Sequence, residues 1–127
     1  MQKYTKSISS NLSSRDLWII AAAVCLMAAI YLLASKLVYG IGFPLDDAWI
    51  HQTYARNLAT YGEWAFRPGI KSAGSTSPLW SALLSIGFLL GLSPYIWTYF
   101  LGGLIIFSLA VVTESAARNL LVSYQPR

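Results

Sequence analysis

Two long stretches without an ionisable charge constrain this chain more than any other feature of its sequence. The first covers residues 17–35 and the second covers residues 72–113. About 20 apolar residues in a helix cross the roughly 30 Å hydrocarbon core of a bilayer, so the two stretches have room for three such helices. Only 11% of all residues are charged, whereas a soluble domain has about a quarter. We therefore predict an all-α integral membrane protein with three transmembrane helices.

Residues 17–39 form the first predicted transmembrane helix, and a polar segment, residues 1–16, precedes it. The charge-free part is longer than the roughly 7–15 apolar residues of a secretory signal peptide, which stays the competing interpretation. The basic residues before it are Lys3, Lys6 and Arg15. The positive-inside rule then places the N-terminus in the cytoplasm and the chain after this helix outside. We expect a multi-pass protein of the cell (inner) membrane.

Residues 40–77 are predicted to form an extracytoplasmic loop that contains a juxtamembrane helix over residues 45–61. The apolar and aromatic residues of this helix recur every three or four positions, at Ile50, Tyr54, Leu58 and Tyr61. This spacing predicts an amphipathic helix that lies along the membrane surface. Asp46 and Asp47 stand at its start, where carboxylates can cap free amides and oppose the helix dipole.

Residues 78–113 are predicted to form a transmembrane helical hairpin, followed by a C-terminal tail over residues 114–127. A hydroxyl residue followed by Pro78 is a typical helix start, and Gly91-Leu92-Ser93-Pro94 marks the turn between the two helices. The run before this turn is short for a span, so a re-entrant pair that never crosses is the alternative. The two arginines of the tail fit an outside location poorly.

Several classes of site are excluded by the residue counts. The single cysteine, Cys25, forms neither a disulfide within the chain nor a cysteine zinc site. The single histidine, His51, excludes a histidine-rich metal centre within this chain. The net charge of +4 is spread along the sequence without a basic cluster, so we expect no nucleic-acid partner.

A block over residues 46–80 resembles a known family. It reads DDAWIHQTYARNL from Asp46, then FRPG from Phe66 and GSTSPLW from Gly74. In order and spacing these motifs resemble the N-terminal region of polytopic GT-C glycosyltransferases, especially the bacterial mannosyl- and arabinosyltransferase groups. The resemblance implies transfer of a sugar from a polyprenyl-phosphate donor to an acceptor hydroxyl on the outer membrane face.

The resemblance also implies roles for particular residues. Asp46 or Asp47 would be the general base that takes the proton from the acceptor hydroxyl, with Asp46 preferred. Asp47 would ligate a divalent cation, Mg or Mn, where one is used. The implied substrate-binding residues are Arg56, Lys71, Thr76 and Ser77. The first two offer a cation for the lipid phosphate, and the last two stand at a helix N-terminus that can receive an anion.

Each of these residues also has a plain structural interpretation. The acidic pair can be a helix cap alone, Arg56 can reach lipid phosphates at the bilayer surface, and Ser75 to Ser77 can cap the next helix. His51 can be a packed histidine. Three helices are too few to enclose a lipid-linked sugar, so we expect the module to need other transmembrane polypeptides. The alternative function is a non-catalytic small membrane subunit that packs in a larger membrane complex.

Overall fold

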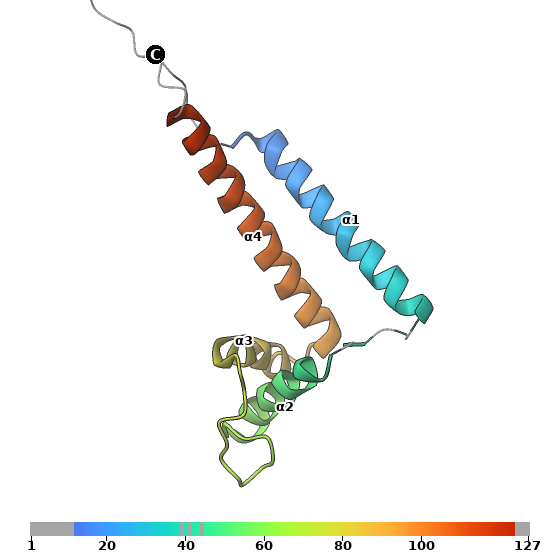
Figure 1. Cartoon of the computed structure of the whole chain (residues 1–127). Coiled ribbons are helices and arrows are strands. Elements are labelled where there is room, and N and C mark those ends of the chain that lie inside the picture. The colour runs from blue at the N-terminus through green and yellow to red at the C-terminus, as the bar shows by residue number, and fades with distance from the viewer. Residues whose placement is uncertain (1–11, 39, 41, 44, 124–127) are drawn as a thin grey trace, which may run out of the picture. The chain divides into compact units, whose positions relative to one another are not determined.

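The computed structural model describes residues 12–38, 40, 42–43 and 45–123, and these residues form four helices and no strand. The helices are α1 (Ser14–Val38), α2 (Asp46–Tyr61), α3 (Pro78–Leu89) and α4 (Pro94–Ser123) (Figure 1). The all-α prediction is confirmed. The first 11 residues of the predicted cytoplasmic segment, residue 39 of the first predicted helix, and residues 124–127 of the predicted tail lie outside the described residues.

Two of the four helices are long and apolar enough to cross a membrane. α1 has 25 residues and α4 has 30, which correspond to about 37 Å and 45 Å. α3 has 12 residues, or about 18 Å, which is less than the roughly 30 Å of a hydrocarbon core. The structure therefore supports two candidate spans, and the predicted third span is not confirmed.

The short length of α3 has a local cause in the turn that follows it. Gly91 adopts a positive φ of 67°, which glycine reaches without steric cost. Pro94 then starts α4, where its fixed φ suits the first helical turn. The apolar run is thus divided unequally, and α4 continues through residues 114–123, which were predicted to belong to the tail.

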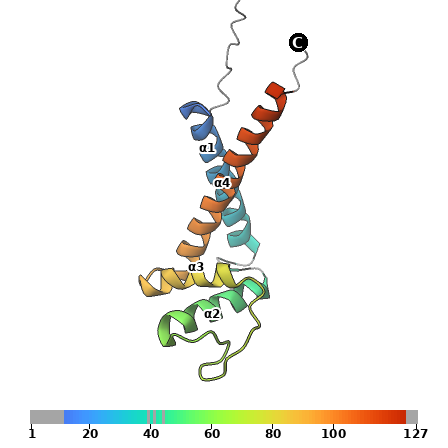
Figure 2. The ribbon, with the colours of Figure 1, turned by 90° about the vertical axis from the view of Figure 1, so that its left-hand side faces the viewer.

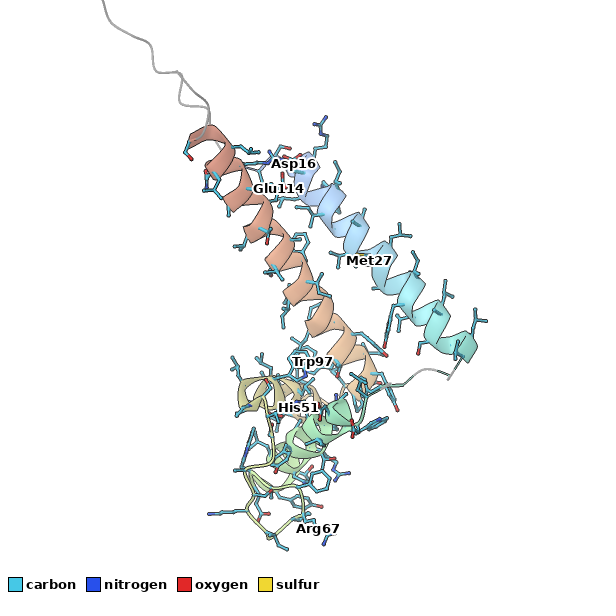
Figure 3. The ribbon with its side chains drawn as sticks, viewed as in Figure 1. Asp16, Met27, His51, Arg67, Trp97 and Glu114 are labelled. Carbon is cyan, nitrogen blue, oxygen red and sulfur yellow. The ribbon has the colours of Figure 1, made fainter. Side chains whose placement is uncertain are left out.

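By their contacts the described residues form two compact units: the first comprises residues 12–29 and 103–123, and the second lies within Ile30–Gly102. In the first unit, the guanidinium of Arg118 lies 3.1 Å from the Asp16 carboxylate and 2.8 Å from the Glu114 carboxylate. Figure 3 labels Asp16 and Glu114 at this end of the two helices. The beginning of α1 therefore lies beside the end of α4, so that the two helices run antiparallel within this unit.

In the second unit, α2 packs against α3, and both run crosswise to the first turns of α4 (Figure 2). The small core comprises Ala55, Leu84 and Leu101, with Trp80, Leu83, Phe88 and Trp97 packed around it. Trp97 of α4 donates its indole N–H to the Leu83 carbonyl of α3 at 2.9 Å. This bond fixes the first turns of α4 on α3.

The buried face of α2 is more polar than the predicted amphipathic helix. Its buried residues are His51, Gln52, Tyr54, Ala55 and Asn57, whereas Tyr61 is exposed. This face packs on α3 and on the following loop, so a helix lying along a membrane surface is not confirmed. Asn57 shows how the polar residues are accommodated, since its amide donates to the carbonyls of Ala65 and Phe66 at 2.9 and 3.0 Å.

The same loop is held by a second network and a tight turn. The Tyr54 hydroxyl lies 2.6 Å from the Ser72 hydroxyl and accepts the Gly74 amide at 2.8 Å. Pro68 and Gly69 form the turn, in which the Ile70 amide donates to the Arg67 carbonyl at 3.1 Å. The loop is therefore an ordered structure that fixes the approach to α3.

Candidate functional site

The acidic pair is exposed at the first turn of α2. Asp46 and Asp47 are its first two residues, and Leu45 precedes them without a side-chain cap. One Asp46 oxygen accepts the Asp47 amide at 3.0 Å, so Asp46 partly fills the capping role that its position suggests. Successive helical residues point about 100° apart, so the two carboxylates face different directions and can serve different partners.

An aromatic cluster of Phe43, Trp49, Tyr95 and Tyr99 holds the segment that leads into α2. The ring centroid of Phe43 lies 5.2, 5.1 and 6.0 Å from the ring centroids of Trp49, Tyr95 and Tyr99, respectively. The Trp49 indole also donates to the Phe43 carbonyl at 3.2 Å, and the Tyr99 hydroxyl to the Gly42 carbonyl at 2.7 Å. This cluster positions the acidic pair at the start of α2.

The predicted cations are not gathered around the carboxylates. Arg56 follows Asp46 by ten positions, or about 15 Å along the axis of α2. Its Nε and Nη2 donate to the Asn57 amide oxygen at 3.3 Å each. Lys71 is exposed in the loop before α3. Within the described part of the chain, neither residue forms an ion pair with the acidic pair.

The segment before α3 departs in part from its predicted helix start. Ser77 is the N-cap residue and Pro78 is at the first helical position, as expected, but the Ser77 hydroxyl makes no capping hydrogen bond. Its backbone carbonyl instead accepts the Ser81 amide at 3.1 Å. The Thr76 hydroxyl lies 3.5 Å from Nε2 of His51. Thr76 and Ser77 are both exposed.

His51 is a buried, hydrogen-bonded residue of the core (Figure 3). Its Nδ1 lies 2.9 Å from the Ser81 hydroxyl and 3.2 Å from the Ser75 hydroxyl, and these two hydroxyls are 2.8 Å apart. Ser75 and Ser81 are buried as well. This arrangement supports the packed-histidine interpretation, in which His51 fastens α2 to the loop and to α3.

The carboxylates offer only part of a cation site. Among the residues that the structure describes, there is no group of three His, Cys, Asp or Glu residues that could hold a metal ion. Mg²⁺ is often held by one or two carboxylates that leave the other positions to water and substrate phosphates. Asp47 could hold such an ion only together with a bound phosphate, and the ion would supply positive charge to a departing phosphate.

Comparisons of the chain with protein-family models, curated proteins and solved structures find no match. The resemblance to GT-C glycosyltransferases therefore depends on the motif residues between Asp46 and Trp80.

Proposed function

We propose that the chain is the N-terminal module of a GT-C-like glycosyltransferase. It takes a sugar from a polyprenyl-phosphate donor and passes it to an acceptor hydroxyl on the outer face of the cell membrane. The observation that carries this function is the exposure of Asp46 and Asp47 at the start of α2, soon after the apolar helix α1. Carboxylates in that position are open to a substrate at the membrane surface.

The chemistry requires a base at the acceptor and a lipid phosphate as the leaving group. The carboxylate of Asp46 or Asp47 takes the proton of the acceptor hydroxyl while the hydroxyl oxygen bonds to the anomeric carbon of the sugar. The bond from that carbon to the phosphate oxygen breaks, and polyprenyl phosphate leaves with the electron pair. The second carboxylate remains available for a cation beside the departing phosphate. Further candidates for binding the phosphate are Lys71 and the amides near Thr76 and Ser77.

A two-span topology accompanies this function. The contact of Arg118 with Asp16 joins the beginning of α1 to the end of α4, which supports placing both ends on the same side of the membrane. If α1 and α4 both cross, the chain between them is outside, and the end of α4 that carries Arg118 is cytoplasmic. This agrees with the positive-inside rule, with which the three-span prediction conflicted.

A reporter fused after Arg127 tests the topology. We expect green fluorescent protein to fluoresce at this position and alkaline phosphatase to be inactive, because the C-terminus is cytoplasmic. Fusions after Gly62, in the segment between α1 and α3, are the matched control and should give the opposite result. An active phosphatase after Arg127 would restore the three-span topology.

The isolated chain leaves much apolar surface uncovered, which leaves room for further transmembrane helices beside the lipid. α1 has no buried residue among those described, and nothing lies within 4 Å of a Cβ built at Gly102 or Gly103. Small residues allow close contact between membrane helices. The same observation favours the alternative function, a non-catalytic subunit of a larger membrane complex.

Native mass and transfer activity, measured on one preparation, separate the two functions. The tagged chain is extracted with a mild detergent, its assembly is weighed, and sugar transfer is assayed with labelled polyprenyl-phosphate mannose and arabinose. We expect an assembly heavier than the 14.0 kDa chain that contains further transmembrane polypeptides and transfers one of the sugars. A stable assembly without transfer of either sugar would support the non-catalytic subunit.

A further inference from the structure

A groove of about 200 Å³ lies where α2 meets the junction of α3 and α4. Its lining residues are Trp49, Gln52, Thr53, Arg56, Phe88, Pro94 and Tyr95. Asp46 and Asp47 are not among them, so the groove is separate from the acidic pair. Its volume suits a small polar headgroup and is too small for a lipid tail.

Gln52, which lines this groove, carries a buried hydrogen-bond acceptor that lacks a partner. Gln52 is only 6% exposed, and its Nε2 donates to the Thr98 hydroxyl at 2.6 Å. That hydroxyl donates in turn to the Pro94 carbonyl at 2.6 Å, which fixes the orientation of the amide. The Gln52 Oε1 has no hydrogen-bond partner among the described residues. Since buried polar atoms are nearly always paired, this oxygen indicates a site for a ligand hydroxyl.

A cation stands at the rim of the same groove. Arg56 is exposed, and two of its nitrogens share the Asn57 amide oxygen at 3.3 Å, so the guanidinium is oriented. The N–H groups of Nη1 are left for another acceptor, and no carboxylate among the described residues pairs with Arg56. An oriented guanidinium is well suited to a phosphate.

The position of the groove in the fold favours a lipid as the source of this phosphate. Pro94 and Tyr95 are the first residues of α4, a candidate span, and Trp49 faces Tyr95 with ring centroids 6.2 Å apart. Trp and Tyr are enriched at the headgroup level of membranes. The neighbouring Leu89, Leu90 and Ile96 are exposed and can lie along acyl chains.

We infer that the groove binds the headgroup of an anionic phospholipid that carries a free hydroxyl, of the phosphatidylglycerol type. Arg56 holds the phosphate, the headgroup hydroxyl donates to Oε1 of Gln52, and the rings of Trp49 and Tyr95 flank the glycerol. An ethanolamine headgroup also offers a donor, but its ammonium would bring a second positive charge beside Arg56. The site depends on the membrane location proposed above and does not depend on sugar transfer.

Native mass spectrometry of the full chain in detergent tests this site. Phosphatidylglycerol, phosphatidylcholine, phosphatidic acid and glycerol phosphate are each added at the same concentration. We expect phosphatidylglycerol to bind at least about tenfold more tightly than the others. Arg56→Gln and Gln52→Leu should each remove most of this preference. Arg67→Gln, which removes the same charge from an exposed position outside the groove, should leave it unchanged.

For each lipid and each variant, one result would contradict the proposed headgroup site. Equal binding of phosphatidylcholine would exclude charge recognition, and equal binding of phosphatidic acid would exclude recognition of the glycerol headgroup. Equal binding of glycerol phosphate would exclude a lipid source. Because Arg56 is exposed, Arg56→Gln is expected to fold even if Gln52→Leu does not. Unchanged lipid binding by Arg56→Gln would contradict the proposed role of the groove. Lipid binding without any transfer activity would leave this site standing while the glycosyltransferase function failed.

Discussion

Asp46→Asn and Asp47→Asn are expected to lower the rate of sugar transfer by the native assembly, with the larger loss, about 10²- to 10⁴-fold, at the residue that acts as the base. An amide cannot accept the proton of the acceptor hydroxyl, although it has nearly the size of a carboxylate and keeps one oxygen acceptor. Both residues are exposed, so neither change should disturb the packing of α2 on α3. The measurement is transfer of labelled sugar from polyprenyl-phosphate mannose or arabinose by membranes that contain each variant.

Glu63→Gln is the matched control for these variants. Glu63 lies in the loop after α2, and its carboxylate accepts the Gly69 amide at 2.6 Å, a role that the glutamine oxygen can keep. The change in charge is the same, but no proton transfer depends on it. Chain levels in the membrane, measured in parallel, should match the unchanged protein. Full transfer activity in both aspartate variants would contradict a catalytic role for the acidic pair.

Gly87→Ala is expected to destabilise the second unit by about 3 kcal/mol, because the added methyl group has no room. A Cβ at this position would overlap Cδ1 of Trp97 and lie 2.5 Å from its Cγ. The indole cannot move away freely, since it donates to the Leu83 carbonyl. The free energy of unfolding can be measured by titration with a denaturing detergent, followed by tryptophan fluorescence.

Two further variants decide whether the contact with Trp97 causes the loss. Gly102→Ala places the same methyl group in α4 where nothing lies within 4 Å, and it should be neutral or stabilise the helix by up to about 1 kcal/mol. Combining Gly87→Ala with Trp97→Ala should cost less than the sum of the two single changes. Additive losses would assign the effect to the helix backbone instead.

The helix ends that depend on nearby capping, proline or glycine residues were predictable from the sequence. The start of α2 at the acidic pair, its end before Gly62 and the start of α3 at Pro78 each depend on residues within one helical turn. Gly62 ends α2 with a φ of 68°, a conformation that glycine adopts most readily. Periodicity could not reveal the buried contacts of His51, because Ser75 and Ser81 are 24 and 30 residues away.

The candidate site was predictable only in part, for the same reason. The motif block located the acidic pair, and the structure places it at an exposed helix start. The motif block could not show that Arg56 turns toward Asn57, or that the amide of Gln52 is held by Thr98 of another helix. The orientation of Gln52 arises from the packing of α2 against α4, and that of Arg56 follows from Asn57, whose amide is held by the loop after α2.

If α4 crosses a membrane, the indole of Trp97 links the tilt of α4 to α3. A membrane helix changes its tilt when the hydrocarbon thickness changes, and α4 is a single continuous helix from Pro94 to Ser123. If the first turn of α4 tilts, the hydrogen bond from Trp97 to Leu83 must either break or carry α3 along. In that case the thickness of the host membrane would act as a force on α3, and through the Ser81 hydroxyl it would reach His51 on α2.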